Sequence, residues 1–210
     1  MPENINKMET VPFVGCDMLH FARMLTDTKE EATYDKPVHL ENVKSIGFAT
    51  GSSISTFYAD DGPRVVYAQV GDETITLDRA NLLPEEYSLL TGAEYNRGLV
   101  SVGNPTPTPG AVIWRSMKSN GKYRYLRALK TTFSVPDINN KTKEQSVDFQ
   151  TQSIEGKNAL RVYDNKGLEF VDEDDPNLDE TVTGKVLAVE WFKDPMFDPT
   201  KPYTPSGEGK

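Results

Sequence analysis

The stretch Ala111–Phe133, AVIWRSMKSNGKYRYLRALKTTF, indicates the fold most clearly. Two runs rich in β-branched and aromatic residues, Ala111–Lys118 and Lys122–Phe133, flank Ser119-Asn120-Gly121. Asn-Gly is the strongest short-range signal for a β-hairpin. The stretch therefore predicts two long antiparallel strands joined by a tight turn.

Similar short runs, separated by turn residues, extend to either side of this hairpin. The chain has 15 Gly and 14 Pro, and they recur along its whole length. A second hairpin is expected from Arg64–Val70 and Glu73–Leu77, with Gly71-Asp72 as a type II′ turn, and Ala59–Pro63 is a further turn signal. The remaining expected strands are Asp17–Leu25, Val43–Thr50, Ile54–Ala59, Gly98–Gly103, Val147–Ile154, Ala159–Tyr163 and Thr181–Trp191.

One helix is expected, over Pro84–Thr91. Proline fits the first helical position, Glu85 and Glu86 suit the positive end of the helix dipole, and Gly92 can end the helix. Its apolar face is predicted to consist of Leu83, Tyr87 and Leu90.

No alternation of strands with helices is present, so we expect an all-β sandwich or barrel with one short helix at its edge. The polar segment Thr26–Lys36 is expected to be a loop. The Pro-rich segment 194–210 is expected to be a tail that stays flexible until assembly, after a β domain over residues 1–193.

Composition argues against a disulfide-linked, a membrane-spanning or a secreted protein. The 210 residues carry a net charge of −9 and include a single cysteine, Cys16, which rules out an intramolecular disulfide. No apolar run approaches the roughly 20 residues of a membrane span, and Met1–Thr10 does not resemble a secretory signal.

The charge is unevenly distributed. Residues 96–136 contain seven bases and no acid, which leaves −16 on the rest of the chain. Tyr123 and Tyr125 lie among these bases, as in some single-strand nucleic-acid sites, but a chain this acidic repels phosphates on average. We expect instead that acidic and basic groups of neighbouring copies attract one another. The candidate subunit-contact residues are Arg115, Lys118, Lys122, Arg124, Arg127, Lys130, Asp172, Glu173, Asp174 and Asp175.

Motifs for catalysis or ligand binding are not found. Cys16 and His20 lack further zinc ligands, and the acidic run from Asp172 has Asn177 and Thr183 where a calcium-binding EF-hand needs Gly and Glu. There is no nucleophile elbow and no phosphate-binding glycine loop. We therefore expect no enzyme activity, no cofactor, no metal and no small-molecule ligand.

The order of several segments resembles the major tail protein, or tail tube protein, family of phages with long non-contractile tails and Gram-positive hosts. Each segment is a weak motif alone, and their order over Val11–Trp191 carries the resemblance. The segments are Val14–Ala22, Phe57–Pro63, Ile75–Leu77, Leu89–Gly92, Asn120–Arg124, Thr142-Lys143 and Phe149–Gly156.

The resemblance implies a structural virion protein made in the host bacterial cytoplasm. Such subunits form rings, usually hexamers, that stack into a hollow tube through which double-stranded DNA passes. It also implies tape measure, tail terminator and distal tail proteins as partners, and no membrane. Sheet edges that pair between copies and head-to-tail contacts that close into rings agree with this role.

Three hypotheses are therefore compared: a tail tube subunit, another β-sandwich virion component such as a head–tail joining or baseplate protein, and a carbohydrate-binding or enzymatic β domain. Long polymers would favour the first, small discrete oligomers the second, and glycan retention the third.

Overall fold

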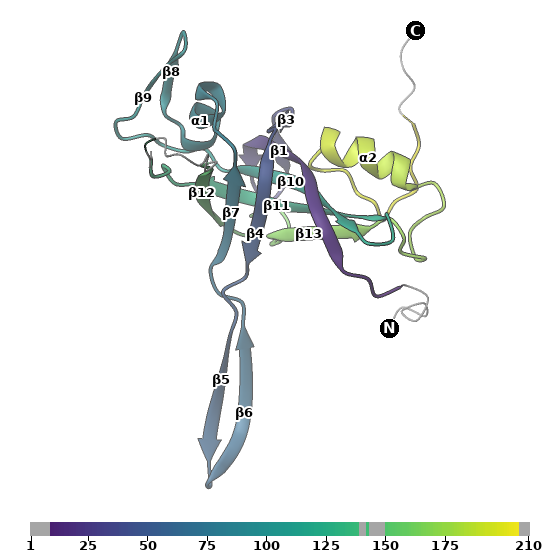
Figure 1. Cartoon of the computed structure of the whole chain (residues 1–210). Coiled ribbons are helices and arrows are strands. Elements are labelled where there is room, and N and C mark those ends of the chain that lie inside the picture. Colours follow the sequence, from purple (N-terminus) through teal and green to yellow (C-terminus); the bar gives the residue numbers. More distant parts are fainter. Residues whose placement is uncertain (1–8, 139–141, 143–149, 206–210) are drawn as a thin grey trace. The chain divides into compact units, whose positions relative to one another are not determined.

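The computed structural model describes residues 9–138, 142 and 150–205. The chain divides into two compact units: unit 1 comprises Met1–Val43, Pro109–Lys130 and Leu160–Lys210, and unit 2 comprises Lys44–Thr108 and Thr131–Ala159. Strands account for 47% and helices for 10% of the structure, which confirms the all-β class (Figure 1). There are two helices in the described part of the chain, not the single one expected.

Unit 1 is built on an antiparallel sheet with the order β2–β1–β10–β11. β3 also pairs with β1, and β13 pairs with β11. The hairpin expected over Ala111–Phe133 is confirmed, with Gly121 in its turn at φ +79°. The bounds of the elements are β1 Phe13–Asp27, β2 Ala32–Tyr34, β3 Val38–His39, β10 Gly110–Lys118, β11 Tyr123–Phe133, β13 Leu168–Asp172 and α2 Gly184–Lys193.

The helix α2 covers one face of this sheet. Its side chains Leu187, Trp191 and Phe192 form a buried cluster with Tyr125 of β11 and with Ala22, Ala111 and Ile113 of β1 and β10. The strand predicted over Thr181–Trp191 is therefore wrong. Thr183 caps the helix by accepting a hydrogen bond from the backbone N–H of Val186, and packing of the helical face overrides the strand preference of the Thr- and Val-rich run.

Two further expectations in unit 1 are wrong. Thr26–Lys36 is not a loop throughout, because β1 continues to Asp27 and β2 pairs with it. Ala159–Tyr163 is not a strand, since the backbone N–H groups of Val162 and Tyr163 donate to the Asp27 carboxylate. A side chain distant in sequence satisfies these donors in place of a strand partner.

The described part of the C-terminal segment, residues 194–205, packs against α2. Phe197 and Tyr203 lie partly buried on the core cluster, and the Tyr203 hydroxyl donates to Glu190 Oε1 at 3.0 Å. The remaining residues of the expected tail, 206–210, lie outside the described residues. That this segment orders only on assembly stays a prediction.

Unit 2 contains a second part of the sheet. The last residues of β11 pair with β12, which pairs with β7, and β4 is the outermost strand. Residues 147–149 of the strand expected over Val147–Ile154 lie outside the described residues. The bounds of the elements are β4 Val43–Ala49, β5 Ser53–Ala59, β6 Gly62–Gln69, β7 Glu73–Arg79, α1 Pro84–Thr91, β8 Glu94–Asn96, β9 Leu99–Ser101 and β12 Gln152–Asn158.

The predicted helix is confirmed as α1, ending at Gly92 with φ +73°. Tyr87 and Leu90 are buried as expected, whereas Leu83 is 57% exposed. Leu83 occupies the N-cap position, just before the first helical residue, so its side chain does not belong to the apolar face that was predicted for it. Glu86 accepts from the Leu83 N–H and from the buried Arg79 guanidinium.

The second hairpin forms elsewhere than predicted. Strand β6 pairs with β5, not with β7, and the turn lies at Asp60-Asp61, whose φ angles are +49° and +60°. Aspartate tolerates these angles, which a type I′ turn requires at both central positions. At Gly71 the chain passes so close to Gly51 that a side chain at position 71 would overlap the Gly51 carbonyl.

Candidate interaction surface

The hairpin formed by β5 and β6 is the most distinctive surface of unit 2. Its two strands pair with each other, and within the described residues they form a separate two-stranded sheet. Figure 1 shows β5 and β6 as a ribbon that continues β4 and β7. An isolated two-stranded hairpin is only marginally stable in water, so this ribbon lacks the usual support of a third strand or a helix.

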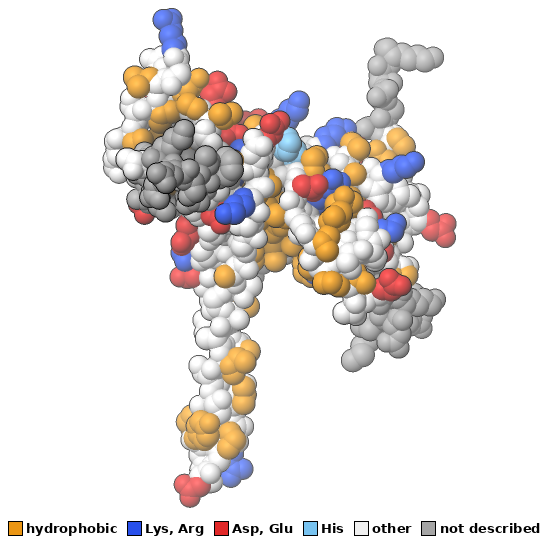
Figure 2. Space-filling model, in the orientation of Figure 1, with side chains coloured by type: hydrophobic (Ala, Val, Ile, Leu, Met, Phe, Trp, Pro, Cys, Tyr) orange, Lys and Arg blue, Asp and Glu red, His pale blue; other side chains and the backbone are white. Residues whose placement is uncertain are grey.

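The stem of this hairpin is uncharged and carries many exposed apolar side chains. Residues 51–59 and 65–71 contain no Asp, Glu, Lys or Arg, and the only charged groups, Asp60, Asp61 and Arg64, lie at the tip. Figure 2 shows hydrophobic side chains along the ribbon and charge at its end. The exposed large hydrophobic residues are Ile54, Phe57, Tyr58, Val65, Val66, Tyr67 and Val70, each at least 56% exposed.

Both faces of the ribbon carry apolar side chains. The register places Thr56 opposite Val66 and Phe57 opposite Val65. Successive residues of a strand point to opposite faces, so Val66 and Val65 lie on different sides. An antiparallel ribbon with one solvated face normally alternates apolar and polar residues, whereas β6 has the unbroken apolar run Val65–Ala68. The pattern predicts that both faces are covered by protein.

Both edges of the ribbon expose backbone groups. Within the described residues, β5 pairs only with β6, and β4, which leads into β5, is the outermost strand of its sheet. Exposed strand edges of high β propensity and low charge pair readily with another chain, and proteins usually protect them with charge or proline. In chemical terms, this surface can add strands and apolar faces to another β structure.

The predicted contact residues on β10 and β11 meet acids of the same chain. Arg124 lies opposite Asp172 in the β11–β13 register and donates to both carboxylate oxygens, at 2.8 and 2.6 Å. Lys118 lies 2.6 Å from Asp174 and 3.2 Å from Asp172. These pairs join four of the ten charged residues that the sequence assigned to contacts between copies.

The other basic candidates are also paired within unit 1. Arg115 pairs with Asp17, Arg127 with Glu169, and Lys130 with Asp27. Lys122 lies 3.9 Å from Glu173. The last acidic candidate, Asp175, accepts a hydrogen bond from the backbone N–H of Asn177. Lys118, Arg127 and Asp172 are buried in the single chain. That these residues contact a neighbouring subunit stays a prediction, now confined to the exposed members of the set.

The pKa values agree with this internal pairing. Burial alone would raise the pKa of Asp172, but hydrogen bonds from Arg124 and Lys118 outweigh it and hold that pKa below its usual range. The hydrogen bonds from Arg124 to Asp172 and from Arg115 to Asp17 raise the pKa of each arginine. The stretch of charge is therefore a set of fixed ion pairs at neutral pH.

Metal or membrane sites are not indicated by the described residues. No three of their His, Cys, Asp and Glu side chains lie close enough to hold a metal ion. His20 and His39 instead stack on each other, with ring centroids 4.7 Å apart. No helix in the described ranges has both the length and the apolar character needed to cross a bilayer.

One feature of the sequence does indicate the hairpin surface. It is the absence of charge over residues 51–59 and 65–71, combined with apolar side chains at consecutive positions such as Val65 and Val66. Strands buried on both faces have this pattern, and a hairpin exposed on one face does not.

Comparisons with known proteins give no further indication of family. No protein-family model matches the chain, and no curated protein matches it.

Proposed function

We propose that this protein is a structural subunit that assembles with copies of itself through the β5–β6 hairpin. The observation that carries the proposal is the exposed ribbon of β5 and β6, whose stem, residues 51–59 and 65–71, has no charge and carries apolar side chains on both faces. Soluble monomers rarely expose contiguous apolar patches beyond a few hundred Å², and larger ones mark interaction sites.

A second copy is the occupant that the chemistry favours. The ribbon offers unpaired edges and apolar faces, and the chain itself supplies the matching partner in the exposed edge of β4. A contact between the hairpin of one copy and the edge of the next is head-to-tail. Such heterologous contacts close into rings or continue as filaments.

The specific form we propose is the tail tube: stacked, hexameric rings enclosing a lumen through which double-stranded phage DNA passes. The resemblance in segment order supports it, and so does the net charge of −9, because an acidic conduit does not retain phosphates. Tape measure and tail terminator proteins are the partners that this role implies. No catalytic step belongs to the proposal.

The test is a charge placed within the uncharged stem. Val66 is 65% exposed, so Val66→Lys leaves the subunit's free energy of unfolding within about 0.5 kcal/mol of the wild type. In an assembly the same ammonium group would be buried without a partner, at a cost of several kcal/mol. We expect polymers of the wild type in negative-stain micrographs and sedimentation profiles, and monomers of the variant.

The matched control is Val189→Lys, at an exposed valine of α2 in unit 1. It makes the same change in charge and size and should polymerise like the wild type. A wild type that stays monomeric at high concentration would refute self-assembly. Closed oligomers that never extend would favour a joining or baseplate protein.

A further inference from the structure

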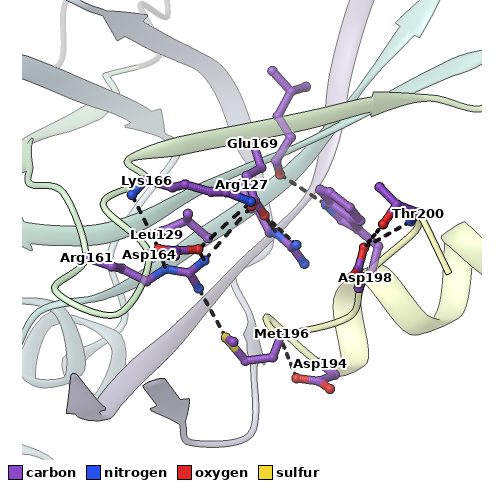
Figure 3. Close-up of polar contacts among 12 residues, drawn as sticks. Arg127, Leu129, Arg161, Asp164, Lys166, Glu169, Asp194, Met196, Asp198 and Thr200 are labelled. Carbon is purple, nitrogen blue, oxygen red and sulfur yellow. Dashed lines mark hydrogen bonds and ion pairs between the residues drawn. The ribbon is translucent and has the colours of Figure 1, made fainter. Parts of the chain in front are cut away.

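A cavity of about 600 Å³ in unit 1 is lined by many charged side chains. It is formed by β11, β13, the turn at Arg161–Lys166, α2 and the C-terminal segment. Figure 3 shows the polar contacts in this region. The side chains that the argument uses are Arg127, Arg161, Lys166, Glu169, Trp191 and Lys201.

Arg127 is the central group of this cavity and is only 4% exposed. Its guanidinium stacks on the Trp191 ring, with Cζ 4.2 Å from the ring centroid, and its Nε donates to Glu169 Oε2 at 2.8 Å. Its Nη1 is buried and has no hydrogen-bond acceptor in the part of the chain that the structure describes. A buried guanidinium N–H without a partner is costly, so it calls for an acceptor beyond those of the chain.

The charges around Arg127 do not balance. Arg161 binds Asp164 through two nitrogens, and Lys166 lies 2.9 Å from Glu169, the carboxylate that Arg127 also uses. Three cations therefore share two carboxylates. Lys201 and Asp198 pair with each other at 3.0 Å, so they do not change this excess of one positive charge among the cavity side chains.

We propose that this cavity binds an oxyanion, a carboxylate or phosphate group of a small molecule, which neutralises the excess charge and accepts from Arg127 Nη1. Oxyanions are the ligands that guanidinium groups bind best, because their geometry matches the fork of N–H donors. Burial and the nearby Arg161 lower the pKa of Arg127, which agrees with a deficit of negative charge.

Access to Nη1 requires a movement of the cavity wall, since the atom is covered in this structure. The wall at Asp198–Lys201 is the part that can yield. Asp198 and Lys201 have side chains 39% and 77% exposed, and the hydrogen bonds that Asp198 accepts from the Thr200 N–H and hydroxyl are local. Segments held by few buried contacts open at low cost in free energy.

The experiment uses Trp191 as the reporter, because Arg127 stacks on it. The chain has two tryptophans, so Trp114→Phe leaves Trp191 as the only indole. Sodium phosphate and sodium acetate are titrated at constant ionic strength, with sodium chloride as the reference. We expect a saturable change in Trp191 fluorescence with the oxyanions and none with chloride. If Trp114→Phe does not fold, the indole N–H signals of the wild type report instead.

A pair of matched variants tests the charge argument. Lys166→Gln removes the excess charge at a side chain 57% exposed and should weaken binding about threefold, as for one unit charge roughly 6 Å away in a water-like dielectric. Lys193→Gln, at a side chain 62% exposed on the same helix as Trp191, changes net charge equally and should leave binding unchanged. Glu169→Gln should strengthen it, and Arg127→Met should abolish it.

Two results would overturn the proposal. One is the absence of a saturable response to either oxyanion, which would mean that a buried water satisfies Nη1. The other is an equal effect of Lys166→Gln and Lys193→Gln, which would mean a nonspecific response to net charge. Neither bears on self-assembly, because the hairpin in unit 2 is unchanged in all these variants.

Discussion

Neutralising Asp172 tests whether the charges of β10, β11 and β13 stabilise the single chain. The Asp172 side chain is 8% exposed and lies within salt-bridge distance of both Arg124 and Lys118. Asp172→Asn keeps the shape and removes the charge. It should therefore leave Arg124 without a carboxylate while barely altering the packing.

The expected loss in the free energy of unfolding is about 2–3 kcal/mol. Breaking a fully buried pair by removing one partner costs about 3–5 kcal/mol. Two observations reduce this figure: Lys118 keeps Asp174 at 2.6 Å, and Arg124, 29% exposed, can be hydrated by water. Urea unfolding followed by tryptophan fluorescence gives the value, with an unchanged m-value showing that the transition itself is the same.

The stabilisation that Asp172 contributes depends on pH. In the folded protein the pKa of Asp172 lies below its ordinary value of 3.8, so the stabilising effect of the carboxylate is fully present above that ordinary value and is lost as pH falls through the lowered pKa. The difference between the wild type and Asp172→Asn should thus be constant near neutral pH and shrink below about pH 4.

The control is Glu180→Gln, which removes one charge from an exposed side chain of the same acidic run. It should change the free energy of unfolding by less than about 0.5 kcal/mol. If Asp172→Asn changed the free energy of unfolding as little as Glu180→Gln, the ion pairs would contribute nothing to the stability of the single chain. These charges would then act in contacts between copies, as the sequence alone suggested.

Two further predictions concern packing. Gly110→Ala should lower the free energy of unfolding, measured in urea, by about 1–3 kcal/mol, because the new Cβ would lie 2.5 Å from the Ala22 carbonyl oxygen. Gly15→Ala in the neighbouring strand β1 has open space at its Cβ and should be neutral or slightly stabilising. Equal effects of the two substitutions would contradict this reasoning. Leu90→Ala should cost about 2–5 kcal/mol in the same assay, whereas Leu83→Ala should stay within about 0.5 kcal/mol, a contrast that a shared helical face would not produce.

Local structure was the part that the sequence determined. The Asn120-Gly121 turn and the helix α1, which begins at Pro84 and ends at Gly92, depend on φ preferences and end effects that a few neighbouring residues decide. The all-β class follows for the same reason, since closely spaced turn residues leave room mainly for short strands.

Choices between competing local signals were settled only by the tertiary structure. The turns at Asp60-Asp61 and Gly71-Asp72 are both plausible in the sequence, and the pairing of β7 with β12 selects the first. The run at Thr181–Trp191 suits a strand by its composition. Burial of Trp191 against β11, which the helix makes possible, stabilises the fold more than the strand preference of these residues does.

The charge pattern shows the same division. The sequence alone places a basic and an acidic segment in the chain, and attraction between copies explains them as well as attraction within one copy. Arg124 and Asp172 are 48 residues apart, and only the antiparallel register of β11 and β13 sets them opposite each other. Register depends on the sum of many distant contacts, which no local pattern of residues contains.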